Sequence, residues 1–121
     1  MKNIVNTTKA PSAIGPYSQG VNVGDLFFFS GQIPLDPSTG EMAENNIKAQ
    51  TKQSLENVKA LLESQGLDFS NVIKTTVFLD SMDDFAAMNE VYAEYFVAPY
   101  PARSAVAVDK SSKTVFCGVN P

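Results

Sequence analysis

The sequence has no histidine, a single cysteine and a single arginine among its 121 residues. Without an imidazole, the chain cannot build a Ser-His or Cys-His nucleophile pair, a histidine general base or a zinc site that uses histidine. The lone Cys117 cannot close an internal disulfide bond, which agrees with a reducing compartment, and we interpret it as a buried strand residue. Any catalysis must therefore rely on hydroxyls, carboxylates, backbone groups and bound water.

Charge and hydropathy exclude further classes of protein. The formal net charge is -4 and the lysines are scattered, which argues against nucleic acid because phosphate binding needs basic residues gathered on one face. Neither a Gly-x-Gly-x-x-Gly run nor a phosphate loop occurs, so we expect no nucleotide cofactor. No apolar run approaches the roughly 18 residues of a membrane span, and the start lacks a signal peptide, so we expect a cytoplasmic protein.

The chain is expected to form one domain over residues 1–121, a common domain size. Two β-prone runs at 21–23 and 26–30 flank Gly24-Asp25 and predict a hairpin. The three consecutive phenylalanines at 27–29 predict that the second strand of this hairpin is buried on both faces.

Apolar residues at three- and four-residue spacing predict an amphipathic helix over residues 45–65. Asn45 or Asn46 can cap its start, and Gly66 can cap its end. A run rich in β-branched residues then predicts a buried strand over residues 72–79.

Ser81 and the acids after it begin a second predicted helix, whose apolar stripe we interpret as core packing: Phe85, Met88, Tyr92 and Phe96. Strands at 102–108 and 113–119, joined by a turn at 110–112, complete the set. This order predicts an α+β two-layer domain in which two helices cover one face of a mainly antiparallel or mixed sheet. The other face needs a partner, so we expect an oligomer.

Arg103, the single arginine, follows a proline-rich turn at 98–101. A guanidinium can hold a carboxylate with two parallel hydrogen bonds, whereas a lysine offers a point charge. Arg103 is therefore the candidate residue for binding a small acid. Taken alone, it is equally compatible with an ion pair on the surface.

Five segments carry short motifs in a fixed order: Ala13-Ile14-Gly15-Pro16-Tyr17-Ser18-Gln19-Gly20, Ser30-Gly31-Gln32-Ile33-Pro34, Gln53-Ser54-Leu55-Glu56-Asn57-Val58, Val72-Ile73-Lys74-Thr75-Thr76-Val77-Phe78-Leu79 and Pro101-Ala102-Arg103-Ser104. In sequence and order they resemble the Rid family of enamine and imine deaminases, also called the YjgF family. The resemblance extends from near residue 10 to about residue 108. It implies a chorismate-mutase-like α+β fold, assembled as a homotrimer with ligand pockets between subunits.

The resemblance also implies an activity. Proteins of this kind hydrolyse reactive 2-enamine and 2-imine acids, such as 2-aminoacrylate and 2-iminobutyrate, to 2-oxo acids and ammonia. No metal and no organic cofactor is required. Imines of this kind already hydrolyse in water, so holding the substrate and a water molecule in register can supply the modest acceleration that is needed.

The site residues implied by the resemblance are Arg103, Tyr17 and Ser30 as catalytic residues, with Arg103, Tyr17, Gly31, Asn89 and Ala105 binding the substrate. Arg103 holds the carboxylate, and Ala105 contributes through its backbone. The residues alone leave other roles open. Tyr17 can be structural in its Gly-Pro turn, Ser30 can bond the backbone at the end of a strand, and Asn89 can face a cleft or solvent.

The tail at 109–121 departs from the family pattern. Family members continue with a Leu-Pro-Lys turn and a last strand with a glutamate that positions the attacking water. Counted without gaps from Arg103, that glutamate falls at Gly118, and no acid follows Asp109. We hypothesise a natural or cloning-derived frameshift, which an unaltered reading frame across related strains would contradict. Without the glutamate, we expect carboxylate binding to survive and turnover to be weak.

Two other functions stay open. A non-enzymatic binding protein or sensor would hold small carboxylates in the same clefts without turning them over, and the missing glutamate favours it. The third candidate function is that of an endoribonuclease or translation inhibitor. The negative net charge and the lack of histidine disfavour it. Steeply salt-dependent binding of RNA would favour this third function.

Overall fold

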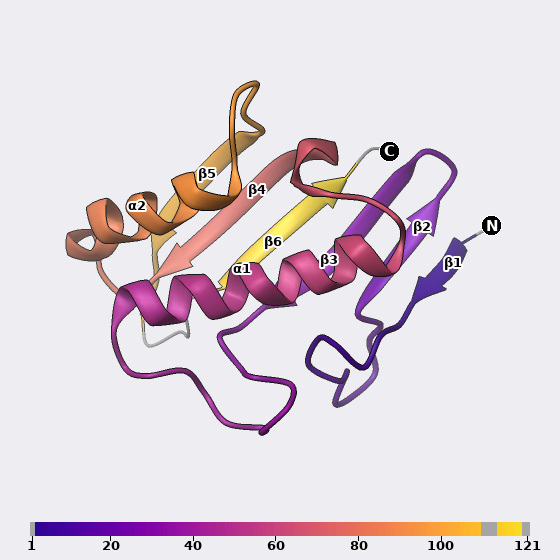
Figure 1. The fold of residues 1–121 in the computed structure, drawn as a ribbon, viewed down its shortest axis with the longest axis horizontal. Helices are drawn as coiled ribbons and strands as arrows, with labels where there is room; N and C mark the ends of the chain where they lie inside the picture. The colour runs from indigo at the N-terminus through magenta and orange to yellow at the C-terminus, as the bar shows by residue number, and fades with distance from the viewer. Residues whose placement is uncertain (1, 110–113, 120–121) are drawn as a thin grey trace.

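The protein is one six-stranded sheet with two helices lying across one of its faces (Figure 1). The computed structural model describes residues 2–109 and 114–119. The strands are β1 (Lys2–Val5), β2 (Gly20–Val23), β3 (Leu26–Gln32), β4 (Val72–Leu79), β5 (Ala102–Ala107) and β6 (Thr114–Val119), and the helices are α1 (Ile47–Ser64) and α2 (Phe85–Tyr95). The predicted α+β fold with both helices on one face is confirmed. The turn predicted at 110–112 lies outside the described residues.

The strand order is β1-β2-β3-β6-β4-β5, so the last strand in sequence lies in the middle of the sheet. All neighbours are antiparallel except β4 and β5, which run parallel. Parallel strands need a crossover connection, and α2 is the helix of that crossover. The predicted hairpin is present as β2 and β3, with Gly24 in its turn at a φ of 58°. The sequence analysis missed β1, which pairs with β2 at the opposite edge from β5.

Helix α1 begins and ends close to where its caps predict. The Asn46 side chain accepts a hydrogen bond from the Ala49 amide at 2.8 Å, so Asn46 is the N-cap and Asn45 is not. The helix ends at Ser64, and Gly66 follows with a φ of 72°, a conformation that favours glycine.

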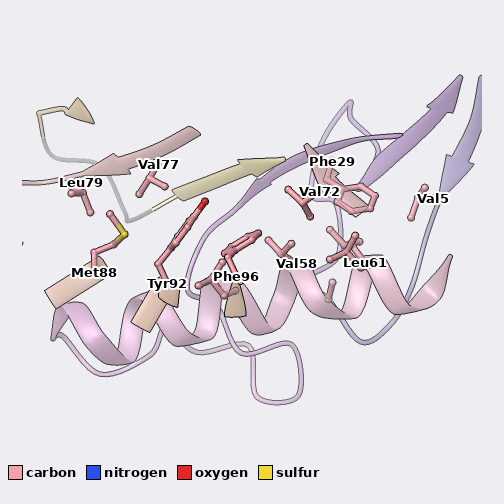
Figure 2. Close-up of a cluster of buried hydrophobic side chains, with 13 residues drawn as sticks. Val5, Phe29, Val58, Leu61, Val72, Val77, Leu79, Met88, Tyr92 and Phe96 are labelled. Atoms are coloured by element: carbon pink, nitrogen blue, oxygen red, sulfur yellow. The ribbon is translucent and has the colours of Figure 1, made fainter. Parts of the chain in front are cut away.

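Helix α2 follows a short 3-10 turn, Met82–Asp84, in which the Ser81 hydroxyl accepts from the Asp83 amide at 3.1 Å. Its apolar stripe enters the core as predicted (Figure 2). Phe96 lies one residue beyond the helix and is still buried. The core forms between the two helices and the sheet, from Val5 and Phe29 at one end to Leu79 and Met88 at the other.

The far face of the sheet carries apolar side chains that the chain itself leaves uncovered. Phe28 is 51% exposed, and Ile4 and Val106 are also exposed. The prediction that β3 is buried on both faces is therefore wrong for the single chain: Phe27 and Phe29 pack on the helix side, while Phe28 points the other way. An apolar sheet face of this kind is typical of an interface.

None of the helices within residues 2–109 and 114–119 is long and apolar enough to cross a membrane.

We predict that Asn46→Ala lowers the free energy of unfolding by about 1 kcal/mol, because it removes the N-cap of α1. Asn45→Ala is the matched control, since its side chain is exposed and makes no hydrogen bond among the described residues. Urea unfolding at one fixed protein concentration measures both. Equal losses in the two variants would contradict the assignment of Asn46 as the cap.

Candidate functional site

The Arg103 side chain lies on the helix-covered face of the sheet, half-buried beneath α2. Its Nη1 donates a hydrogen bond to Asn89 Oδ1 at 2.6 Å. The guanidinium carbon lies 4.8 Å from the centre of the Tyr92 ring and 5.3 Å from that of Phe85. Both distances are within the range of cation–π interactions, which extends to about 6 Å. An amide and two aromatic faces, all neutral, therefore hold this cation.

Local structure explains why these side chains meet. Phe85, Asn89 and Tyr92 are spaced by four and three residues on α2, so they share one face of the helix. Arg103 is paired with Thr75 in the parallel β4–β5 ladder, and Thr75 is fully buried. The Thr75 hydroxyl is 2.8 Å from the Tyr92 hydroxyl, which fixes the helix and its face against this strand pair.

A pocket of about 490 Å³ opens beside the guanidinium, between α2 and the segment that enters β5. Its lining is mainly apolar and aromatic, and Asn89 and Arg103 contribute an amide and a charge. The lining residues are Asn89, Tyr92, Ala93, Tyr100, Pro101 and Arg103. Asn89, which the sequence left open between cleft and solvent, lies on the pocket. A mostly apolar cavity with few polar groups is typical of a small-molecule site.

The alternative left open for Arg103, an ion pair on the surface, is not found among the described residues. Among the described residues the ion pair is Lys48 with Glu90, at 2.6 Å and largely exposed. The hydrogen bond and the charge of Glu90 raise the pKa of Lys48. Within this part of the chain Arg103 has Asn89 as its hydrogen-bond acceptor and no carboxylate beside it. A guanidinium has five N–H donors, so most of them stay available to a ligand.

The backbone of Ala105 points toward the free edge of the sheet. The Val108 amide donates to the Leu79 carbonyl at 2.8 Å, so residue 108 directs its polar groups toward β4. Successive residues in a strand direct these groups to opposite sides, so those of Arg103, Ala105 and Ala107 point away from β4. The Ala105 side chain packs against the core. The backbone groups of Ala105 therefore face the edge of the sheet formed by the described strands, and their role in binding a ligand stays a prediction.

Tyr17, Ser30 and Gly31 form a second group around β3. Tyr17 is 53% exposed, and its hydroxyl accepts from the Ile14 amide at 3.4 Å. The Ser30 hydroxyl donates to the Ser18 carbonyl at 2.6 Å, which agrees with the backbone-bonding role left open for it. Strand β3 continues to Gln32, so Ser30 does not end the strand as expected.

Two hollows flank this second group. Tyr17 and Gly31 line one of about 140 Å³, and Tyr17 and Ser30 line another of about 410 Å³ together with Phe28 of the uncovered face. Strands β6 and β4 lie between β3 and β5, which separates the two groups by three strand spacings, roughly 14 Å. One chain therefore does not bring Tyr17, Ser30 and Gly31 into the pocket of Arg103.

Sequence reasoning missed the aromatic wall of the Arg103 pocket. Tyr92 and Phe85 were interpreted as core residues, and Tyr100 was given no role. The three-residue spacing between Asn89 and Tyr92 is the signal that could have linked Tyr92 to the site.

A partly buried hydrogen bond between the helices helps to hold α2 in place above the strands. The Tyr95 hydroxyl donates to Glu56 Oε2 of α1 at 2.7 Å. Burial raises the pKa of Tyr95, and the hydrogen bond and charge of Glu56 add to this effect. Tyr95 therefore stays protonated at neutral pH and remains a hydrogen-bond donor to α1.

The part of the tail that the structure describes, Thr114–Val119, forms a strand although its sequence departs from the family pattern. Backbone pairing places Thr114–Val119 as β6 between β3 and β4, so the strand predicted at 113–119 is confirmed over these residues. Gly118 pairs with Phe28 on one side and Lys74 on the other. The side chain of Cys117 lies outside what the structure describes.

Comparison with known proteins identifies the family. Residues 7–116 match the model of the family described as endoribonuclease L-PSP. A RutC family protein of Pyrococcus horikoshii is 54% identical over 115 residues, 95% of this chain and 91% of the relative. The 2-iminobutanoate/2-iminopropanoate deaminase of Salmonella typhimurium is 48% identical, over 95% of this chain and 91% of its own length. The chain belongs to this family, the YjgF/Rid family, as its motifs predict.

A solved structure of a relative gives the same fold. The crystal structure of Escherichia coli TdcF with bound serine superposes with a TM-score of 0.93 at 42% identity, covering 98% of both chains. The α+β architecture described above is thus that of the family.

Proposed function

We propose that the protein binds small 2-imino acids by their carboxylate and hydrolyses them to 2-oxo acids and ammonia. The observation that supports this best is the guanidinium of Arg103, which meets a neutral amide and two rings beside a pocket. Within residues 2–109 and 114–119 this cation has no carboxylate partner, so its charge stays available to a carboxylate ligand. The imine deaminase of Salmonella typhimurium and the serine bound to TdcF support the same ligand class.

The reaction needs no metal and no organic cofactor in this proposal. Water adds to the carbon of the C=N bond while the nitrogen gains a proton, giving a carbinolamine. The carbinolamine then expels ammonia, and its hydroxyl becomes the carbonyl of the 2-oxo acid. Arg103 holds the carboxylate, Tyr17 bonds or shields the substrate, and polar groups near Ser30, Gly31 and Ala105 orient the nitrogen and the water. Positioning supplies the acceleration.

The proposed site requires two copies of the chain. Within one copy, three strand spacings separate Arg103 from Tyr17, and the sheet leaves Phe28 and its apolar neighbours uncovered. We propose a homotrimer in which the β3 group of one subunit faces the Arg103 pocket of the next. Burying the uncovered face gives the driving force for this assembly.

The first prediction concerns the carboxylate clamp. Arg103→Ala is expected to raise the Kd for 2-oxobutanoate, the stable product, by at least about tenfold, since hydrogen bonds to charged groups are lost. Calorimetry measures the affinity, and a coupled assay follows hydrolysis of 2-iminobutanoate. Lys48→Ala is the control, because it removes an exposed cation close to the start of α1 and leaves the pocket intact.

A charge-specific variant sharpens this test. Asn89→Asp keeps the shape of the hydrogen-bond acceptor but sets a carboxylate beside Arg103, which competes with the ligand. Binding should weaken even though a hydrogen bond to Arg103 is retained. Wild-type affinity in either Arg103→Ala or Asn89→Asp would refute the clamp.

The second prediction concerns the shared site. Arg103→Ala and Tyr17→Ala chains, each impaired alone, should regain activity when they are refolded together. Random mixing leaves both side chains intact in one site of four, so activity should reach about a quarter of the wild-type value. Mixing without refolding is the control. No recovery in mixed oligomers would show that each site lies within one chain.

Binding without turnover is the second candidate function, and the tail favours it. No acid follows Asp109, and Gly118 stands where the motif of the resemblance calls for the water-positioning glutamate. In that case the Arg103 pocket would hold small carboxylates as a carrier or sensor. The endoribonuclease named in the family description is not favoured, because the net charge is -4.

The third prediction separates these two candidates. A Cβ at Gly118 would meet the Lys74 Cβ at 3.9 Å, an ordinary contact, so a side chain fits there. Gly118→Glu should therefore raise kcat for 2-iminobutanoate hydrolysis severalfold and leave the Kd for 2-oxobutanoate unchanged. Gly118→Gln, which has the same size and no charge, is the control. Full turnover by the unmodified protein, with no gain in Gly118→Glu, would contradict a role for an acid at this position.

A further inference from the structure

We propose that Tyr92 is a positioning residue that orients the Arg103 guanidinium for the carboxylate. This inference rests on the proposed function, since it assigns a role to a residue that acts through the clamp. The apolar stripe of α2 would otherwise make Tyr92 a core side chain like its neighbours Met88 and Phe96 (Figure 2).

Two kinds of contact restrain the Arg103 side chain, a hydrogen bond to an amide and cation–π contacts with two rings. The guanidinium carbon lies over the Tyr92 ring, 4.8 Å from its centroid, and over the Phe85 ring, 5.3 Å from its centroid. Asn89 accepts the hydrogen bond from Nη1 at 2.6 Å. Together, the rings and the amide limit how far the guanidinium can move. A planar guanidinium restrained in this way can bind a planar carboxylate through two parallel hydrogen bonds.

The Tyr92 ring is itself fixed from two sides. Its hydroxyl is 2.8 Å from that of Thr75, which is fully buried and paired with Arg103 in the β4–β5 ladder. The ring also stacks on Phe96, with centroids 4.3 Å apart and planes inclined by 23°. The strand pair that carries Arg103 therefore also sets the ring that supports its guanidinium. Neither phenylalanine at this position nor another buried apolar residue would keep the bond to Thr75.

A platform of this kind affects ligand affinity more than the chemical step. It restricts the rotamers of the Arg103 side chain before the ligand arrives, so less conformational entropy is lost when the ligand binds. The carboxylate is held equally in the ground state and the transition state, and such uniform binding changes KM and leaves kcat nearly constant. A side chain that only stabilised the fold would not produce this split.

The experiment compares Tyr92→Leu with Phe69→Leu. Tyr92→Leu should raise both the Kd for 2-oxobutanoate and the KM for 2-iminobutanoate by about tenfold, with kcat changed less than about twofold. Phe69→Leu removes a half-buried ring that packs edge-on against Tyr95 and Phe96 and is not one of the two rings against Arg103. It should lower the urea midpoint and leave both constants near wild type. Tyr92→Phe keeps the ring but loses the hydrogen bond to Thr75, so its affinity should lie between those of the wild type and Tyr92→Leu.

The outcomes are distinct. If Arg103→Ala weakens binding and Tyr92→Leu does not, the positioning role of Tyr92 is contradicted and the proposed function is retained. The inference is also contradicted if Phe69→Leu weakens binding as much as Tyr92→Leu. If the wild type does not bind 2-oxobutanoate, or if Arg103→Ala binds it normally, the proposed function and the positioning role of Tyr92 are both contradicted. Tyr92→Met, which retains more volume, replaces Tyr92→Leu in these comparisons if the latter does not fold.

Discussion

The parallel pairing of β4 with β5 is the constraint on which the candidate site depends. Parallel neighbours cannot be joined by a tight turn, so the chain must cross over a face of the sheet, and α2 makes that crossing. The crossing carries Asn89 and Tyr92 above the strand pair. The register of the same pair sets Arg103 beside Thr75, which holds Tyr92. One pairing thus brings a cation, an amide and a ring together from separate segments of the chain.

The sequence was sufficient for the elements whose signals are local. Strand Val72–Leu79 was predicted to the residue because a β-branched run marks it, and α1 was predicted within two residues because Asn46 and Gly66 cap its ends. Strand β1 was missed because most of its four residues are exposed and carry no apolar pattern. The place of β6 in the middle of the sheet depends on long-range pairing, which no local pattern encodes.

The site was less predictable than the fold, for a physical reason. A stripe at helical spacing shows that Phe85 and Tyr92 face inward, but burial against Leu79 and burial against a guanidinium give the same pattern. Asn89 lies beside that stripe, and only the parallel register decides that it meets Arg103. The exposure of Phe28 could not be foreseen either, since an apolar strand residue can be buried by its own chain or by another copy.

In the proposed function, the residue that binds the carboxylate and the position expected to orient the water lie on opposite faces of the sheet. Arg103 lies on the helix-covered face of β5, whereas Gly118 is paired with Phe28 and Lys74, whose side chains lie on the uncovered face. Lys74 Nζ donates to the Ser104 hydroxyl at 3.0 Å, next to Arg103 in sequence but across the sheet from its guanidinium. A change at Gly118 therefore does not disturb the contacts of Arg103 in the same subunit. On the proposed assembly, a tail that lacks the acid weakens the attack of water and leaves the clamp intact.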